Sequence, residues 1–272
     1  MGMTLLTGAS SGIGRSLARR IAIDGEPVVV VARRQVLLDS LVKEIEGAGG
    51  RALAISCDVT DRGAVHAAVR QAEAHFGPTT TLIANAGGAS ATDATRFRAQ
   101  QIVDVVNLNL FGVANCIEAV LPAMLERRSG HLVATGSLAA YRGLPAAGAY
   151  SAAKAALTNL MESLRIDLRS AGIDVTVVAP GFVRTKPDKK KNKPFSLELE
   201  AATALIHNAI KRRTPYYAFP KSLLVLMWLG WALPAPLYDR LLAGRGPKVK
   251  SSEFSPDATE TSHRGDAETQ RR

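Results

Sequence analysis

Tyr150 and Lys154 are the residues whose types and spacing most directly suggest chemistry. They stand four residues apart in the run AYSAAKAAL, which places both side chains on one face of a helix about one turn apart. An ammonium group beside a phenol favours the phenolate, so we expect the pKa of Tyr150 to fall toward neutral pH. Such a tyrosine can exchange a proton with a carbonyl oxygen. Because a Y-x-x-x-K pair also arises by chance on plain helix surfaces, the neighbouring motifs must decide.

A glycine-rich segment near the start of the chain is the strongest of these motifs. An apolar run of strand type at residues 3–6 leads into Thr7-Gly8-Ala9-Ser10-Ser11-Gly12-Ile13-Gly14, and the helix-forming run RSLARRIAI follows. Strand, glycine-rich turn and helix in this order begin a dinucleotide-binding fold. Gly8 allows a tight turn, Gly12 lets the backbone approach a pyrophosphate, and Gly14 lets the helix pack closely on the strand. The helix N-terminus then offers free N–H groups to phosphate.

The chain resembles the short-chain dehydrogenase/reductase family over roughly residues 3–220. The resemblance rests on the G-x-x-x-G-x-G spacing of the loop, on the Tyr-Lys pair, and on further motifs in the family's order and spacing. These are Asp58-Val59, Asn85-Ala86-Gly87, Asn109, Ser137, and Pro180, Gly181, Val183 and Thr185 in the run PGFVRT. Ala84 replaces the first asparagine of the family's N-N-A-G motif, which puts a structural hydrogen bond in doubt but no catalytic group.

The resemblance implies a role for each of these matches. Asn109, Ser137, Tyr150 and Lys154 would form the catalytic set, while the Asp-Val pair would approach the adenine and the PGFVRT run would lie beside the nicotinamide. We expect a carbonyl oxygen between Tyr150 and Ser137, with Ser137 stabilising the developing alkoxide and Tyr150 delivering the proton. Lys154 would also bind the nicotinamide ribose, and Asn109 would hold a water that links Lys154 to solvent. Structural alternatives stay open: Ser137 as a helix cap and Asn109 as a helix-breaking residue.

The choice of cofactor depends on the end of the second predicted strand. NAD-specific sites place an acidic side chain there, about 20 residues past the glycine loop. Here Ala32 takes that position and Arg33 and Arg34 follow. A guanidinium group suits the 2′-phosphate of NADP, so we expect NADP, bound by Arg33 with help from Arg34 and from Ser10 or Arg15. The alternative for Arg33 is a solvated surface arginine.

Strand-like and helical patterns alternate along the chain. Short runs rich in Val, Ile and Leu predict buried strands at 28–32, 52–57, 80–84, 131–135 and 174–178. Helices are predicted at 36–46, 62–75, 97–126 with a break near Asn109, 149–170 and 197–211. We therefore expect an α/β fold with one doubly wound, Rossmann-like parallel sheet and helices on both faces, spanning residues 1–246. Residues 247–272 are polar and predict a disordered tail.

Composition bounds the class of protein. Of 272 residues, 47% are apolar and 21% charged, as in ordinary globular proteins. The two cysteines, Cys57 and Cys116, are expected to be buried free thiols. The sequence contains no cluster of His and Cys residues, so we expect no metal site. The net charge is +10, and residues 184–250 alone hold fourteen Lys/Arg against four Asp/Glu. Because this one stretch carries the whole excess, we expect no general nucleic-acid surface. We also expect no secretory leader and a cytoplasmic location.

The oddest stretch is the apolar run 223–233, which contains both tryptophans of the chain. It is shorter than the ~20 residues of a spanning helix. Three interpretations of the C-terminal apolar segment 222–246 stay open: a lipophilic wall of the substrate pocket, a subunit interface, or peripheral contact of residues 221–245 with the inner face of a membrane. Pro234 and Pro236 suit a helical hairpin. The lysine-rich residues 186–193 predict a charged loop, which the family resemblance implies is a lid over the substrate; its lysines would be solvated or face an acidic headgroup.

The leading hypothesis is an NADP-dependent oxidoreductase that transfers hydride between NADPH and a carbonyl or secondary alcohol. The substrate would be bulky and lipophilic, of a lipid, sterol-like or 3-keto-sphingoid type, and the extension loosely resembles that of 3-ketosphinganine reductases. The alternative is a membrane-associated, NADP-binding sensor or scaffold without turnover, against which the complete catalytic set argues. A sugar-nucleotide epimerase is disfavoured because its G-x-x-G-x-x-G loop is missing. The resemblance also implies a homo-oligomer, a dimer or tetramer, formed through helices near 109–126 and 149–170.

Overall fold

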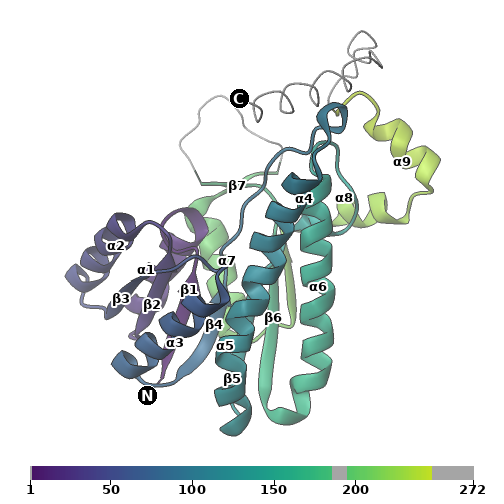
Figure 1. The fold of residues 1–272 in the computed structure, drawn as a ribbon. Helices are drawn as coiled ribbons and strands as arrows, with labels where there is room; N and C mark the ends of the chain where they lie inside the picture. The colour runs from purple at the N-terminus through teal and green to yellow at the C-terminus, as the bar shows by residue number, and fades with distance from the viewer. Residues whose placement is uncertain (1, 186–194, 247–272) are drawn as a thin grey trace, which may run out of the picture.

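One sheet of seven parallel strands organises the chain (Figure 1). The computed structural model describes residues 2–185 and 195–246. The strands are β1 Met3–Thr7, β2 Val28–Ala32, β3 Ala52–Ser56, β4 Thr79–Ala84, β5 Gly130–Thr135, β6 Ile173–Pro180 and β9 Tyr216–Phe219. They follow in the spatial order β3-β2-β1-β4-β5-β6-β9, and every neighbouring pair runs parallel. The order reverses between β1 and β4, so a ligand crevice is expected beyond their carboxyl ends.

Helices cover both faces of the sheet, which confirms the predicted doubly wound fold. On one face lie α1 Gly12–Ile23, α2 Gln35–Gly47 and α7 Leu199–Lys211; on the other lie α3 Arg62–Phe76, α5 Gly112–Glu126 and α6 Gly148–Leu168. Because both faces are covered, consecutive strand residues are buried and burial does not alternate along the strands. All five residues of β2, with the sequence VVVVA, are buried.

The helix predicted over 97–126 is interrupted but not broken. It begins as α4 Ala99–Val106, continues through a π-helical turn at Asn107–Phe111, and ends as α5. Within the described residues, Ala99–Glu126 is the one run long and apolar enough to cross a membrane by length and composition. Val113, Cys116, Val120 and Met124 on its α5 part are buried in the core cluster beside the sheet, as expected of a core helix.

Three short strands lie outside the strands expected from the sequence. β9 holds only four residues between Pro215 and Pro220, too few for a recognisable pattern. β7 Val183–Arg184 pairs with β8 Leu197–Glu198 in a separate two-stranded sheet. The helix predicted from residue 197 therefore begins later, at Leu199. Residues 186–194 and 247–272 lie outside the described residues, so the lid and the disordered tail stay predictions.

The apolar C-terminal segment forms a helical hairpin. α8 Lys221–Ala232 follows β9, and α9 Ala235–Leu242 begins directly after Pro234, its N-cap. Figure 1 shows α9 projecting from the body of the molecule at the end opposite the N-terminus. We refer to α8 and α9 together as the α8–α9 hairpin.

Candidate active site

The glycine-rich turn between β1 and α1 has the backbone that a phosphate cradle requires. Gly8 and Gly12 have φ values of +70° and +55°, a region that other residues rarely adopt. A Cβ atom on Gly14 would lie 2.4 Å from the Gly8 carbonyl oxygen, so only glycine fits there. Ser11 is the N-cap of α1 but its side chain makes no capping hydrogen bond. The first N–H groups of α1 are therefore available to an anion.

Asn85 ties this turn to two neighbouring strands. Its Nδ2 donates to the Thr7 carbonyl at 3.1 Å, and its Oδ1 accepts from the Thr135 hydroxyl at 3.1 Å. The Thr7 hydroxyl in turn accepts from the backbone N–H groups of Asn85 and Ala86, at 3.1 and 3.0 Å. The ends of β1, β4 and β5 are thus fastened together below the cradle. Ala84, the departure from the family motif, is buried in β4.

Two arginines stand at the end of β2. Arg34 donates to the hydroxyl groups of Ser10 and Ser11, at 2.8 and 3.1 Å, and so is fixed against the glycine loop. The Arg33 side chain is 73% exposed and lies 3.7 Å from the Asp58 carboxylate. Arg15, the other arginine considered from the sequence, instead binds the Leu37 carbonyl and pairs with Glu44 on α2. The structure therefore places Arg33 and Arg34, but not Arg15, beside the cradle.

The Asp58-Val59 pair closes the far side of the same cleft. The Thr60 backbone N–H, which donates to Asp58 at 3.0 Å, and then the Thr60 hydroxyl and Arg33 hold the pKa of Asp58 below its ordinary value. The Val59 carbonyl accepts from Asn115 Nδ2 at 2.9 Å. Sequence reasoning missed Asn115, because a single asparagine in a helix carries no pattern.

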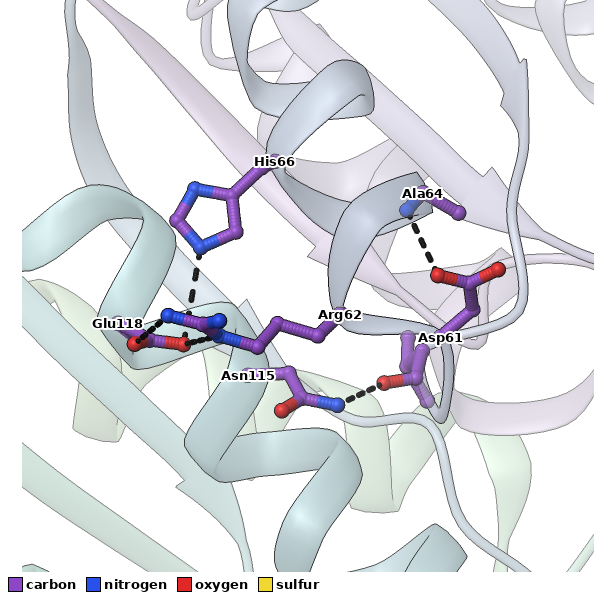
Figure 2. A network of polar contacts seen from close by, with 7 residues as sticks. Asp61, Arg62, Ala64, His66, Asn115 and Glu118 are labelled. Carbon is purple, nitrogen blue, oxygen red and sulfur yellow. Dashed lines mark hydrogen bonds and ion pairs between the residues drawn. The ribbon is translucent and has the colours of Figure 1, made fainter.

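A polar network between α3 and α5 surrounds this contact (Figure 2). Arg62 donates two hydrogen bonds of 2.6 Å to Glu118, and His66 lies 3.6 Å from the same carboxylate. Asp61 caps α3 by accepting from the Ala64 N–H at 2.9 Å. Figure 2 shows the Asn115 side chain extending from the helix that carries Glu118. The network fixes α3 against α5 and with them the loop that bears Asp58.

These groups enclose one cleft of about 180 Å³. Its lining comes from the glycine loop, the ends of β2 and β3, and the segment after β4, and it comprises Gly8, Ser10, Ser11, Ala32, Arg33, Arg34, Cys57, Asp58, Val59, Ala86, Gly87 and Leu108. Nine of these residues were predicted to bind cofactor. Cys57 and Leu108 are new, and burial raises the pKa of the Cys57 thiol. Cys116 is also buried and free, so both cysteines are as expected.

Ser137 and Tyr150 meet at the end of β5. The Ser137 side chain lies near enough to the Tyr150 phenol to act on its pKa. Ser137 Oγ also accepts from the Ala139 N–H at 3.1 Å and caps the 3₁₀ turn Leu138–Ala140, so the capping alternative holds alongside the contact with Tyr150. Burial raises the pKa of Tyr150, and the hydrogen bond from Ser137 opposes this shift. The expected fall of this pKa is therefore wrong, because desolvation outweighs the stabilisation of the phenolate.

Lys154 is buried one turn further along α6. Its side chain is 3% exposed, its Nζ donates to the Thr135 carbonyl at 2.7 Å, and the same atom lies 5.7 Å from the centre of the Tyr150 ring. Burial lowers the pKa of Lys154 to about 8. Gly87 lies beside it, since a Cβ atom there would be 3.5 Å from Lys154 Nζ and 2.7 Å from Asn109 Oδ1.

Asn109 lies in the π-helical turn and is fully buried. Its Nδ2 donates to the carbonyls of Gly88 and Val105, at 2.8 and 2.9 Å, and its Oδ1 accepts from the Gly88 N–H at 3.4 Å. The side chain thus joins the π turn to the segment after β4, close to Lys154. Both amide hydrogens are used, so Asn109 has a structural role in the π turn, although it does not break the helix, and the expected water link stays a prediction.

The PGFVRT run lies between the cradle and the α8–α9 hairpin. A Cβ atom on Gly12 would lie 3.2 Å from Thr185 Cγ2, so this end of the run reaches the glycine loop. A Cβ atom on Gly181 would lie 2.7 Å from Leu223 Cδ2 on α8 and 3.2 Å from Leu138 Cδ1. Pro180 ends β6, and Val183 begins β7. The base of the hairpin therefore packs beside the turn that follows Ser137.

Comparison with known proteins relates this arrangement to a large group of enzymes. A family model described as short chain dehydrogenase matches residues 3–195. A protein of Myxococcus xanthus named as an uncharacterized oxidoreductase is 40% identical over 237 residues, covering 86% of this chain and 94% of its own. A ketoacyl reductase of Nostoc is 35% identical, covering 77% and 75%. The solved structure of an actinorhodin polyketide ketoreductase with NADPH matches with a TM-score of 0.75 at 28% identity, covering 82% of this chain and 97% of that one.

Proposed function

This chain belongs to the short chain dehydrogenase family, and we propose that it is an NADP-dependent reductase of a bulky, lipophilic carbonyl compound. As a member of the family it is an oxidoreductase that binds a nicotinamide dinucleotide and acts on carbonyl or alcohol groups. One observation carries the proposal: Ser137 and Tyr150, whose side chains interact, lie just beyond the end of β5, and Asn85 fastens that strand end to the phosphate cradle. The reverse reaction, oxidation of a secondary alcohol, uses the same groups.

Tyr150 and Ser137 perform the proton and charge chemistry in this proposal. The cofactor, when bound, supplies hydride from its nicotinamide ring. Because burial raises the pKa of Tyr150, the phenol stays protonated at neutral pH and can give its proton to the substrate oxygen as negative charge develops there. The Ser137 hydroxyl donates a hydrogen bond to the same oxygen and stabilises that charge. Reduction thus uses the protonated tyrosine.

Lys154 and Asn109 support the return of a proton to Tyr150. With its pKa lowered to about 8, Lys154 exchanges protons near neutral pH, and its Nζ lies within 5.7 Å of the Tyr150 ring centre. We assign Lys154 the reprotonation of the phenolate through solvent. Asn109, by holding the π turn to Gly88, fixes the wall of this region beside Lys154.

The residues around the cradle fit the 2′-phosphate of NADP. Arg34 is already ordered against Ser10 and Ser11, and Arg33 stands beside it with most of its guanidinium open to a ligand. Ala32 lines the cleft where an acid would bind the ribose hydroxyls of NAD. The guanidinium groups of Arg33 and Arg34 and the hydroxyls of Ser10 and Ser11 therefore surround the end of β2. Among the described residues, the one acidic side chain that lines this cleft, Asp58, lies on its opposite side and is near Arg33. NADP is the cofactor that this charge distribution favours.

A bulky, lipophilic substrate is supported by the apolar surroundings of the catalytic turn. Leu138, which follows Ser137, is buried in a cluster with Ala179, Ala218 and Leu223. Met227 and Leu224 of α8 pack against this cluster. The α8–α9 hairpin thus extends an apolar surface outward from the catalytic serine, in accord with a long-chain, sterol-like or 3-keto-sphingoid ketone.

The test is NADPH oxidation by purified protein across carbonyls from small ketones to long-chain and steroidal ones, with NADH in parallel and Tyr150→Phe as the inactive control. We expect turnover with bulky apolar ketones, little with small ones, and preference for NADPH. Turnover of small polar ketones alone would contradict the substrate class, and equal use of NADH would contradict the cofactor assignment.

We also propose that the hairpin contacts an anionic lipid surface on the cytoplasmic side. Its exposed apolar side chains are Val225, Leu226, Trp228, Leu229, Trp231, Leu237 and Leu241. The helix α8 is apolar on all sides, which requires a covering environment. Lys221, Arg240 and Arg245 flank this surface and form no ion pair among the described residues, so an isologous contact between two copies would bring like charges together, whereas anionic lipid would complement them.

Sedimentation with vesicles tests the lipid contact. The protein should sediment with phosphatidylglycerol vesicles and much less with phosphatidylcholine vesicles, and the Trp228→Ser/Trp231→Ser double variant should remain in solution. Binding to neither vesicle would contradict the proposal.

A homo-oligomer is the remaining part of the proposal. Phe111 in the π turn, Leu125 on α5 and Ile166 on α6 are large apolar side chains with exposed surface. They support association through these two helices. Light scattering should give a dimer or tetramer, and Ile166→Lys should shift it toward monomer.

A further inference from the structure

The connection from Ser137 to Tyr150 is held at both of its ends. At the start, Ser137 caps the turn Leu138–Ala140. At the far end, the Thr92 N–H donates to the Ala146 carbonyl at 2.8 Å, and the Thr92 hydroxyl accepts from the Ala149 N–H at 3.1 Å. Between these points the chain must pass a residue in a strained conformation, because Ala146 has φ +58°, which costs a non-glycine residue about 1–2 kcal/mol. Surrounding contacts are needed to keep this connection in one conformation.

Arg142, at the middle of the connection, binds the end of α8. Its Nη1 donates to the carbonyls of Gly230 and Leu233, at 2.6 and 2.7 Å, and lies 3.4 Å from that of Trp231. The last carbonyls of a helix have no partner within the helix and carry the negative end of its dipole. α8 has no basic residue in its own last turn. Arg142 therefore supplies from the catalytic connection the cap that α8 lacks.

Tyr238 on α9 makes two further contacts between the hairpin and the connection. The Arg142 guanidinium carbon lies 3.9 Å from the centre of the Tyr238 ring on α9, in the range of a cation–π contact. The Tyr238 hydroxyl donates to the Gly143 carbonyl at 2.7 Å. Arg142 thus binds both helices of the hairpin, and Tyr238 binds the residue next to Arg142. Among the residues that the structure describes, no carboxylate pairs with Arg142.

These contacts are separate from those at the base of the hairpin. Leu223, at the start of α8, is buried against Leu138, and it would hold the base without Arg142. The end of α8 and the middle of α9 are instead held by the Arg142 contacts. The middle of the catalytic connection is also held by Tyr141, which packs on the Leu138 cluster, and by the Ala147 N–H bond to the Leu144 carbonyl. Arg142 and Gly143 are the residues of the connection that bind the end of α8 and the middle of α9.

We propose that Arg142 is a positioning residue for the reaction: through its contacts with Gly230, Leu233 and Tyr238 it locks the α8–α9 hairpin to the connection between Ser137 and Tyr150 and so forms the substrate side of the site. The inference rests on the proposed function for the roles of Ser137 and Tyr150. It assigns Arg142 no contact with reacting atoms. Its effect is on how well the site receives the carbonyl substrate, whereas the nucleotide cleft shares no residue with the lock.

The variants Arg142→Ala, Arg142→Lys and Tyr238→Phe test the lock, with Arg70→Ala, an exposed arginine of α3, as the matched control. We expect Arg142→Ala to raise KM for an apolar ketone about tenfold or more with a smaller change in kcat, and to leave the affinity for NADPH unchanged. Arg142→Lys keeps one donor and the charge and should recover part of the loss. Tyr238→Phe should act in the same direction more weakly, and Arg70→Ala should behave like the wild type.

Hydrogen exchange gives a readout that does not need turnover. Arg142→Ala should accelerate exchange of amides in residues 138–147 and in α8 and α9, while amides of β1 and α1 keep their protection. Unchanged exchange in residues 138–147 would overturn the inference, as would an equal loss of NADPH affinity. Absence of turnover by the wild type on every ketone would overturn the proposed function instead, and the exchange result would still decide on the lock.

Discussion

The Lys154 ammonium lies 5.7 Å from the centre of the Tyr150 ring and gives a 2.7 Å hydrogen bond to the Thr135 carbonyl. The spacing of four residues in α6 does place both side chains on one face, as the sequence predicts. The environment sets their protonation differently, however, because burial raises the pKa of Tyr150 and lowers that of Lys154 to about 8. Both shifts favour the neutral forms, a protonated phenol and an uncharged amine. At neutral pH the phenol is therefore protonated, as donation of a proton to a carbonyl requires, while Lys154, with a pKa of about 8, is still largely an ammonium.

Removal of the phenol should abolish turnover without disturbing the cofactor. We expect Tyr150→Phe to lower kcat by about 10³-fold or more, because the general acid is lost, and Ser137→Ala to lower it by about 10²-fold, because one donor to the developing charge is lost. NADPH affinity, measured by fluorescence titration, should remain near that of the wild type in both. Substantial activity of Tyr150→Phe would show that another group supplies the proton.

The buried lysine should make stability depend on pH in a defined window. A lysine whose pKa falls from its ordinary 10.5 to about 8 on folding binds fewer protons in the folded than in the unfolded state between these values, so stability rises with pH there. Below pH 8 the cost of burying the charge is fully present. Lys154→Met lacks this dependence. Between pH 7 and pH 10 the wild type should therefore gain about 2 kcal/mol relative to the variant.

Urea unfolding of both proteins at pH 7, 8.5 and 10, without cofactor, measures this difference. Groups other than Lys154 titrate alike in the two proteins and cancel. A difference in free energy of unfolding that stays constant across the three pH values would mean that Lys154 keeps an ordinary pKa in the folded state.

Reversal of charge at Arg33 should separate the two nicotinamide cofactors. Arg33→Glu places a carboxylate where the 2′-phosphate would bind, so we expect KM for NADPH to rise about 100-fold and that for NADH to change little. Steady-state kinetics with both cofactors measure the ratio, and Arg70→Glu controls for the change in net charge. Equal effects on NADPH and NADH would remove Arg33 from the phosphate site.

The contact between Gly181 and Leu223 should show as a coupling of stabilities. A Cβ atom on Gly181 would lie 2.7 Å from Leu223 Cδ2, so Gly181→Ala should destabilise the fold by about 2 kcal/mol through overpacking. In the Gly181→Ala/Leu223→Ala double variant the added methyl group has room, and the loss should be smaller than the sum of the single losses. Gly143→Ala, where a Cβ atom would meet nothing within 4 Å, is the control. Additive losses would contradict the close approach.

Asn115 should affect cofactor binding from outside the cleft. Asn115→Leu keeps the size of the side chain but removes the hydrogen bond to the Val59 carbonyl. We expect the NADP dissociation constant to rise about fivefold, since Val59 lines the cleft, while kcat at saturating cofactor stays unchanged. Thermal shift with increasing NADP gives the affinity. A lowered kcat with unchanged affinity would place the effect of Asn115 elsewhere.

The parts of the fold that follow from local pattern could be predicted. The buried strands from β1 to β6 each contain a short run of Val, Ile, Leu or Ala, and the glycine loop needs positive φ at Gly8 and Gly12, so local pattern locates them. β9 could not be located in this way, because its four residues join the sheet only through pairing with β6. The π turn at Asn107–Phe111 also left only a weak signal, an expected break near Asn109.

Site residues that belong to a sequence motif could be predicted. Residues whose position or protonation depends on contacts with distant parts of the chain could not. Arg15 follows the glycine loop directly in sequence and Arg34 lies 20 positions beyond Gly14, yet of the two only Arg34 faces the cradle, because Glu44 on α2 engages Arg15. The pKa of Tyr150 depends on burial, which spacing along a helix does not give. Arg142 and Asn115 are single polar residues whose partners lie 88 and 56 positions away, so no sequence window contains both ends of either contact.

Both tryptophans of the chain, Trp228 and Trp231, lie on α8, and their side chains are 58% and 60% exposed. Indole fluorescence of this protein therefore originates from one helix of the hairpin and from nowhere else. The natural sequence thus contains its own optical probe. A change in the colour or quenching of that emission on addition of cofactor, substrate or lipid reports the surroundings of α8 directly, without any label.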